Sequence, residues 1–188
     1  VNEAIGLMLS TTNLLKPSDG QPIVGPSKDM VLGVYYLTQM FDNRNGEGRM
    51  FSSFDEVQTA LDLGYVHIHA KIKLQTATYL DDDGKVYDDD EPRVRVIETS
   101  PGRVIFNSVL PERMRFINKS LDKGGVNKFL DRVYRRMGDK DTVETADRIK
   151  DIGFRYATYS GTTMAVADLT VPEERVTILD GAQKRVEQ

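Results

Sequence analysis

The hydrophobic residues of this chain change their spacing partway along it, and this change restricts the folds that it can adopt. Between Val66 and Leu80 apolar residues alternate with polar ones, which predicts a half-buried strand. From Val126 to Met137 apolar residues recur every three or four positions, which predicts a helix with one buried face. A second helical pattern from Asp141 to Tyr156 follows after a short connection, so we expect an antiparallel helical hairpin. Together these patterns predict an α+β fold.

Further elements are expected on both sides of that strand. Residues 1–15 carry enough apolar side chains to predict a largely buried helix, and a loop rich in proline and glycine follows between Pro17 and Pro26. The other expected elements are a buried helix at 30–37, a short helix after the capping sequence Ser53-Phe54-Asp55-Glu56, strands at 93–97 and 103–110, and a final helix from Pro172.

These expectations divide the chain into three parts, each with its own character. Residues 1–40 contain helices and the loop, residues 41–112 form a β-rich middle with one short helix, and residues 113–188 contain the helical hairpin and the start of another helix. The last helix has no stop signal and the chain opens on Val1 inside a helical pattern, so we expect a piece of a larger protein.

Composition excludes several classes of protein. The chain has 188 residues, of which 39% are hydrophobic, so it can form a core. It has no cysteine, which excludes disulfides and thiolate metal sites. It has no stretch of 18 apolar residues and no basic and apolar leader, so we expect a cytoplasmic protein with no membrane contact.

Charge is distributed unevenly. Residues 81–91 carry seven acids and one lysine, whereas residues 113–155 carry twelve lysines and arginines against seven acids. The basic stretch is typical of a solvated helical face, and a nucleic-acid contact is the alternative.

Three motifs suggest a ligand, and each also has a structural explanation. His67 and His69 would share one strand face, as two metal ligands do, but no third ligand is nearby, which favours a structural role. The Asp81-Asp82-Asp83-Gly84 sequence is similar to a calcium loop but would begin at Tyr79, so it favours a hairpin turn. The glycine-rich run at 45–48 lacks the following lysine and Ser or Thr of a phosphate loop. We therefore predict no catalytic residue and no metal ligand in this chain.

Several longer runs resemble the β′ (largest) subunit of bacterial DNA-directed RNA polymerase. The longest runs from Leu9 to Thr38. Others, in the order of the family, are Gly46-Glu47-Gly48, Val66 to Ile72, Thr99 to Asn107, Phe116 to Lys119, Ile152 to Thr158 and Asp168 to Glu173.

The resemblance implies an internal segment of a nucleotidyltransferase. The magnesium-binding aspartate motif of the family is absent from this sequence and would lie before Val1, so Mg²⁺ would be bound outside this chain. The segment would line the pore, or secondary channel, through which nucleotides reach the active centre. The helix from Pro172 would begin the coiled coil at the channel rim, where transcript-cleavage factors dock. The implied partners are the β, α, omega and sigma subunits, DNA and RNA.

The loop before residue 30 supplies the pore-lining candidates. It is long and lies between apolar segments that must be buried, so its polar side chains are expected to face the channel. These side chains are Asn13, Gln21, Ser27, Lys28 and Asp29. A lysine there would attract a triphosphate; the alternative is that Lys28 only solvates a helix start. The rival interpretation of the whole chain is a free-standing α+β nucleic-acid-binding module that uses its basic hairpin.

Overall fold

The structure is a computed structural model of the 188-residue chain and describes residues 2–9, 13–18, 20, 23, 25–80, 91–163, 165–170 and 174–186. In chain order its elements are η1 (Ala4–Met8), α1 (Asp29–Thr38), β1 (Met50–Phe51), α2 (Phe54–Asp62), β2 (Ile72–Thr78), β3 (Arg93–Thr99), α3 (Pro101–Ser108), η2 (Glu112–Met114), α4 (Lys123–Met137), α5 (Asp139–Ser160), η3 (Val166–Asp168) and α6 (Glu174–Val186). Several helices around one sheet confirm the α+β class.

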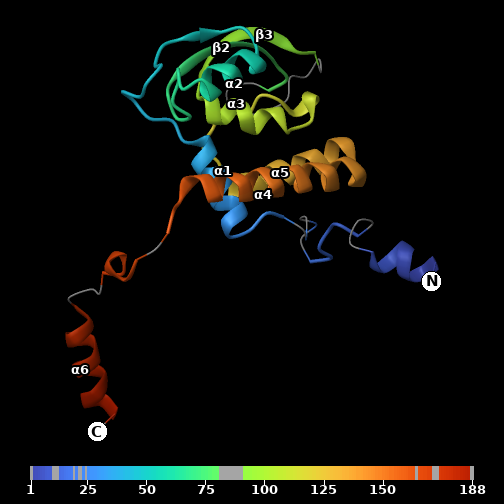
Figure 1. The fold of residues 1–188 in the computed structure, drawn as a ribbon. Helices are drawn as coiled ribbons and strands as arrows, with labels where there is room; N and C mark the ends of the chain where they lie inside the picture. The colour runs from blue at the N-terminus through green and yellow to red at the C-terminus, as the bar shows by residue number, and fades with distance from the viewer. Residues whose placement is uncertain are drawn as a thin grey trace.

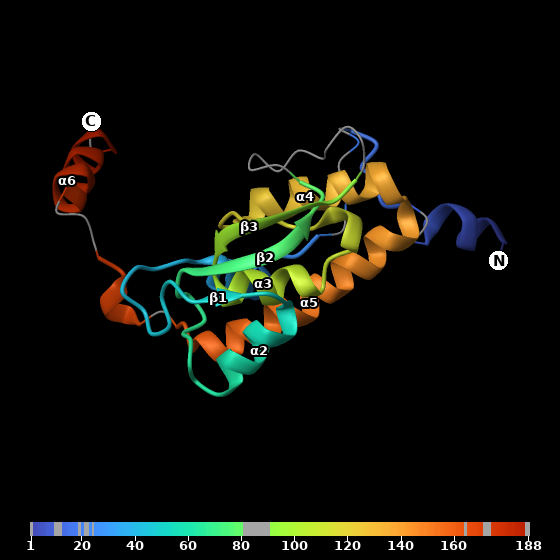
Figure 2. The same ribbon diagram turned by 90° about the horizontal axis from the view of Figure 1, so that it is seen from above.

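A small sheet forms one layer of the molecule. β2 lies in the middle, parallel to β1 and antiparallel to β3, with Lys73 opposite Glu98. Ile72 and Leu74 of β2 and Ile97 of β3 point inward, where they meet α2 and α3 in one core cluster. In Figure 1 the sheet is at the top, α2 and α3 lie beneath it, and α4 and α5 form the layer below α3. Figure 2 shows the same sheet from above, with β1, β2 and β3 side by side.

Helix α3 is the centre of the fold, and every residue from Pro101 to Asn107 is buried. Its Val104 packs under the sheet, whereas Phe106 packs with α1, α4 and α5. The predicted strand at 103–110 is therefore wrong. A helix that is buried on all sides has the same continuous apolar run as a buried strand. The missed signal was the helix start itself, since Pro101 is in the first turn and the Ser100 hydroxyl accepts a hydrogen bond from the Arg103 amide.

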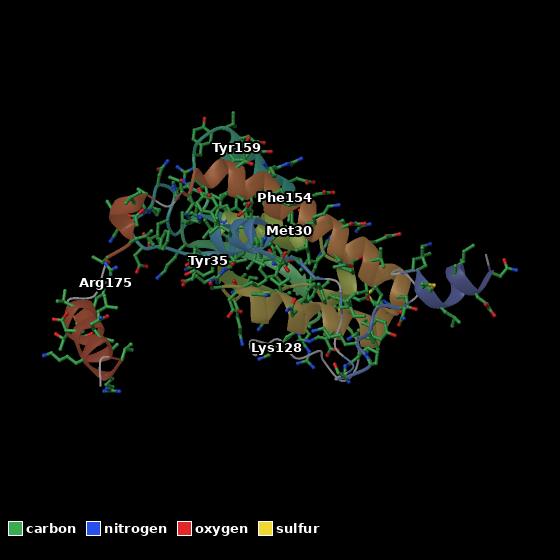
Figure 3. All side chains as sticks on the ribbon, turned by 90° about the horizontal axis from the view of Figure 1, so that it is seen from below. Met30, Tyr35, Lys128, Phe154, Tyr159 and Arg175 are labelled. Atoms are coloured by element: carbon green, nitrogen blue, oxygen red, sulfur yellow. The ribbon has the colours of Figure 1, made fainter. Side chains whose placement is uncertain are left out.

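Three glycines allow the helices to approach very closely. Gly33 of α1 and Gly153 of α5 meet where these helices cross: a Cβ on Gly33 would lie 2.7 Å from the Ala157 nitrogen, and one on Gly153 would lie 2.9 Å from the Met30 Cα. Gly102 of α3 meets the end of α1, where a Cβ would lie 3.1 Å from the Leu37 carbonyl carbon. Figure 3 shows this crossing from below, with Met30 beside Phe154.

The predicted helical hairpin is confirmed. Asp122 caps α4 by accepting a hydrogen bond from the Gly125 amide, and Gly138 separates α4 from α5 with a positive φ of 81°. Figure 2 shows α5 turning back along α4 after this glycine. The helices at 30–37 and after Ser53 are likewise confirmed as α1 and α2.

The two ends of the chain lie away from this body. Residues 2–9 are all exposed, and η1 ends at Met8, so the prediction of a largely buried helix over residues 1–15 is wrong. Within the described part of this stretch, Ile5, Leu7, Met8 and Leu9 are exposed, whereas Leu14 is buried. The final helix is present as α6, with no buried residue, and it stands apart from the rest in both views. None of the described helices is both long and apolar enough to cross a membrane.

Candidate functional site

The segment that enters α1 presents three of the predicted pore residues together. Ser27, Lys28 and Asp29 are consecutive and exposed at the start of the helix. The Ser27 carbonyl accepts a hydrogen bond from the Met30 amide at 3.1 Å, and the Lys28 carbonyl accepts one from the Leu32 amide at 3.0 Å. Asp29 lies in the first turn, where the positive end of the helix dipole favours a carboxylate. The backbone is thus held by α1, while the polar side chains remain free to meet solvent or a ligand.

The segment before it lies against α4. Pro26 is buried, and Gly25 lies so close to α4 that a Cβ there would be 2.8 Å from the Asn127 Oδ1. The approach to α1 is therefore fixed on both sides, by α4 before Ser27 and by α1 after Asp29.

Asn13 contacts the N-terminal segment rather than the start of α1. It is exposed, its side-chain amide donates to the Leu7 carbonyl at 3.3 Å, and its backbone amide donates to the Leu9 carbonyl at 3.1 Å. The structure therefore brings Ser27, Lys28 and Asp29 together but ties Asn13 to the N-terminal segment. Gln21, the fifth predicted residue, lies outside the described residues.

Three side chains from other elements hold the carboxyl end of α1. The last carbonyls of a helix have no partner within it. Here His69 Nε2 donates to the Tyr36 carbonyl at 2.8 Å, Arg103 Nε to the Thr38 carbonyl at 2.9 Å, and the Ser100 hydroxyl to the Gln39 carbonyl at 3.1 Å. The helix behind the candidate pore residues is therefore clamped to α3 and to the turn before β2.

Arg103 is the charged side chain of this clamp. It is only 8% exposed, and burial lowers the pKa of its guanidinium. Its Nη1 also donates to the backbone carbonyl and the Oδ1 of Asn118, both at 3.1 Å. These three acceptors are neutral oxygens, and the negative end of the α1 dipole favours a cation at this position. Sequence reasoning missed this residue because it expected a strand there.

The two histidines are structural and do not share a strand face. They lie in the turn before β2, which begins only at Ile72, so the predicted strand from Val66 starts six residues too early. His67 Nδ1 accepts a hydrogen bond from the His69 amide at 3.1 Å, and the ring of His69 packs edge-on against Tyr36 and Phe41. Burial lowers the pKa of both rings, with Arg44 adding to the effect. Within the described part of the chain, no group of three or more His, Cys, Asp or Glu residues could hold a metal ion.

Several basic residues of the stretch 113–155 have partners within the chain. On the helix surfaces Arg135 pairs with Asp131 at 2.9 Å, Arg148 with Glu144 at 3.4 Å, and Lys150 with Asp147 at 3.1 Å. Arg115 points toward the end of α3, where its Nε donates to the Leu110 carbonyl and its Nη2 to the Ser108 carbonyl. This pattern fits a solvated helical face. The acidic residues 81–90, including the predicted hairpin turn, lie outside the described residues.

Comparison with known proteins places the chain in one family. The model of the family described as RNA polymerase Rpb1, domain 3 matches residues 13–169. The chain is 43% identical over 187 residues to the DNA-directed RNA polymerase subunit beta' of Aquifex aeolicus (strain VF5), covering 99% of this chain and 11% of that protein. It is 41% identical over 197 residues to the subunit of the same name from Thermoanaerobacter sp. (strain X514), covering 98% and 16%, and 40% identical over 189 residues to that of Acinetobacter baylyi (strain ATCC 33305 / BD413 / ADP1), covering 99% and 13%.

The resemblance seen in the sequence is therefore confirmed, and the packing explains several of its motifs. Gly33, Gly102 and Gly153 are the close-contact glycines, Arg103 is the buried clamp, and all four lie in the matching runs. The chain spans only 11 to 16% of the length of these relatives. This chain belongs to the RNA polymerase Rpb1 domain 3 family and is similar over nearly its whole length to bacterial β′ subunits.

Proposed function

We propose that this chain forms the wall of the secondary channel, or pore, in the β′ subunit of a bacterial DNA-directed RNA polymerase. The observation that carries the proposal is the exposed triplet Ser27, Lys28 and Asp29 at the start of a helix whose far end is clamped. Polar side chains on a fixed backbone suit a channel wall. Because the backbone is already ordered, no conformational entropy of the backbone is lost each time a nucleotide passes.

In this proposal the chain holds polar side chains in place along the channel and contributes positive charge to its wall. The whole enzyme carries out template-directed nucleotidyl transfer with Mg²⁺, and the metal would be held by residues outside this chain. Lys28 provides a compact positive charge that raises the local concentration of triphosphates. Asp29 lies beside it, so the lysine attracts an anion without making the surface uniformly basic. The chain alone is expected to synthesise no RNA.

Helix α6 provides a contact site for other proteins. Val176, Ile178, Leu179 and Val186 are exposed on it, and an exposed apolar helix needs a partner to be stable. A helical partner elsewhere in β′ would complete the rim coiled coil, on which transcript-cleavage factors dock. The β, α, omega and sigma subunits, DNA and RNA are the other partners of the assembled enzyme.

A Lys28→Ala substitution in the whole polymerase tests the channel role. We expect the apparent KM for nucleotides to rise by about threefold to tenfold, the effect of losing about 0.7–1.4 kcal/mol of attraction. Lys73→Ala is the matched control, because Lys73 is exposed on the outer face of β2. An unchanged KM in the Lys28 variant, or an equal rise in both variants, would contradict the proposal.

The rival function, a free-standing nucleic-acid-binding module, would use the α4–α5 hairpin. Arg135, Arg148 and Lys150 each pair with an acidic residue one helical turn away on the same helix. These pairs leave less positive charge on the hairpin to neutralise phosphates. Binding of a short duplex by the isolated chain, with an affinity that falls steeply with salt, would favour this module instead. The coding sequence upstream of Val1 also discriminates, since a β′ subunit requires the aspartate motif there.

A further inference from the structure

The Asn45-Gly46 pair forms a tight turn that none of the proposed functions uses. It is the one Asn-Gly pair in the 188-residue sequence. The Glu47 amide donates to the Arg44 carbonyl at 3.1 Å, which closes a four-residue turn with Asn45 and Gly46 in its centre. Gly46 has a φ of 83° and Asn45 is not among the residues with positive φ, so the turn is of type II.

This turn is held against the segment that follows α2. The Asn45 side-chain amide donates to the Gly64 carbonyl at 3.0 Å, and the Asn45 carbonyl accepts from the His67 amide at 2.8 Å. Gly46 lies against the same segment: a Cβ on it would be 2.5 Å from Val66 Cγ1 and 2.7 Å from the Tyr65 carbonyl oxygen. Only glycine fits at position 46. Glycine has no side chain, so nothing at position 46 hinders the approach of its backbone nitrogen to the Asn45 side chain.

We propose that Asn45 is a deamidation site that the folded turn keeps in check. The Gly46 amide nitrogen loses its proton to hydroxide and attacks the Asn45 side-chain carbonyl carbon; the new C–N bond closes a five-membered imide, and the side-chain nitrogen leaves as ammonia. Water then opens the imide at either carbonyl and gives aspartate or isoaspartate at position 45. No electron transfer is involved.

The fold opposes the first step in two ways. Ring closure requires the Gly46 nitrogen to eclipse the Asn45 Cβ, whereas a type II turn, with ψ of about +120° at its second residue, points that nitrogen away. The hydrogen bond from the Asn45 side-chain amide to the Gly64 carbonyl also restrains the rotation that the attack requires. Attack therefore requires the turn to open, and the modification rate reports that local opening.

The modification would also prevent the turn from closing again. In the unmodified chain the Asn45 side-chain amide donates a hydrogen bond to the Gly64 carbonyl oxygen. The carboxylate of the product cannot donate, so its negative charge would repel that oxygen. An isoaspartate additionally lengthens the backbone by one methylene in a turn that has no spare space around Gly46. We therefore expect the 42–48 loop to detach from the 64–67 segment in modified molecules.

The test compares the purified chain in buffer and in urea at mildly alkaline pH. Trypsin cuts at Arg44 and Arg49, so mass spectrometry follows Asn45 and Asn43 in separate peptides. In urea we expect Asn45 to deamidate well before Asn43, whose attacking nitrogen belongs to Arg44. In buffer the Asn45 rate should be at least about tenfold lower, as an opening free energy of about 1.4 kcal/mol gives. Digestion in heavy-oxygen water marks any deamidation that occurs during the digest.

Two controls keep the result unambiguous. Asn45→Gln should abolish the mass gain in that peptide, because ring closure would require a less favourable six-membered imide. Hydrogen exchange at the His67 amide, which donates to the Asn45 carbonyl, should become faster in the deamidated fraction. Absence of deamidation at Asn45 in urea would overturn the assignment of the site, and equal rates in buffer and urea would overturn the protection by the turn.

Discussion

At the scale of single residues, the side chains that hold the end of α1 are the most sensitive positions in this chain. Replacing Arg103 with Met removes its hydrogen bonds to Thr38 and Asn118, among them the one to the carbonyl oxygen of the buried Thr38. We expect the free energy of unfolding to fall by about 2–4 kcal/mol. Arg135→Met is the control, because that side chain is 73% exposed and its loss should cost less than about 1 kcal/mol. Urea titration measures both, and equal losses would contradict a special role for Arg103.

The two histidines make the same region sensitive to acid. Burial lowers the pKa of His67 and His69 below the ordinary value of 6.5. The folded state therefore binds fewer protons than the unfolded state, so the stability that these rings contribute is complete above about pH 6.5 and is lost as the pH falls below it. Protonation of His67 at Nδ1 would also remove the acceptor of the His69 amide.

Urea unfolding at a series of pH values tests this sensitivity. Between about pH 7.5 and 5.5, the stability of the unmodified chain should fall more steeply than that of a His69→Gln variant, since glutamine does not titrate. Asp and Glu titrations contribute equally to both proteins and cancel in the difference. Parallel pH profiles for the two proteins would show that His69 carries no acid sensitivity.

At the scale of the elements, the crossing of α1 and α5 depends on the absence of side chains. A Cβ at Gly33 or Gly153 would collide with the backbone of the other helix, which cannot move aside as a flexible side chain can. We expect Gly33→Ala and Gly153→Ala each to destabilise the fold by more than about 2 kcal/mol. Because Lys28 lies directly before α1, a displacement of α1 should also change the nucleotide KM of the whole polymerase.

A glycine elsewhere gives the matched control for this prediction. Gly181 lies in the exposed helix α6, and a Cβ there would have no heavy atom within 4 Å. Gly181→Ala should leave the melting temperature of the body unchanged and raise the helix content of α6, since alanine favours a helix over glycine by about 1 kcal/mol. Gly33→Ala and Gly181→Ala variants of equal stability would show that the crossing tolerates a methyl group.

The start of α3 is a second element-level determinant. The Ser100 hydroxyl accepts a hydrogen bond from the Arg103 amide and donates to the Gln39 carbonyl, so it caps one helix and extends the end of another. Ser100→Ala should reduce the free energy of unfolding by about 1–2 kcal/mol. Ser53→Ala, which removes only the cap of α2, should cost about 1 kcal/mol or less. A smaller loss for Ser100→Ala than for Ser53→Ala would contradict its double role.

At the scale of the whole molecule, the chain consists of a packed body with two exposed helical ends. The body has three adjoining hydrophobic clusters that α3 connects, whereas neither η1 nor α6 contains a buried residue. Hydrogen exchange should therefore be fast across residues 174–186 and slow across α3, because an isolated helix of this length is marginal in water. Slow exchange across α6 in a strictly monomeric sample would contradict its need for a partner in the larger subunit.

Periodicity and capping alone were sufficient to predict much of the secondary structure. The α4–α5 hairpin, α1, α2 and β3 followed from apolar spacing and, for α2, from the capping sequence at Ser53, because these signals act within one or two turns of chain. The resemblance to β′ subunits also came from sequence alone. The exposed triplet at Ser27–Asp29 was expected from its polarity.

Tertiary packing decided the rest. The apolar run at 103–110 taken alone fits a strand or a helix, and the helix start at Ser100 and Pro101 favours the helix. Only the position of α3 between the sheet and the α1, α4 and α5 layer shows that it must be buried on every side. The run at 1–15 predicted burial, but burial requires an opposing apolar surface, and the structure leaves residues 2–9 exposed. The roles of Arg103, His69 and the three close-contact glycines depend on residues far away in the sequence, and local patterns carry no information about such contacts.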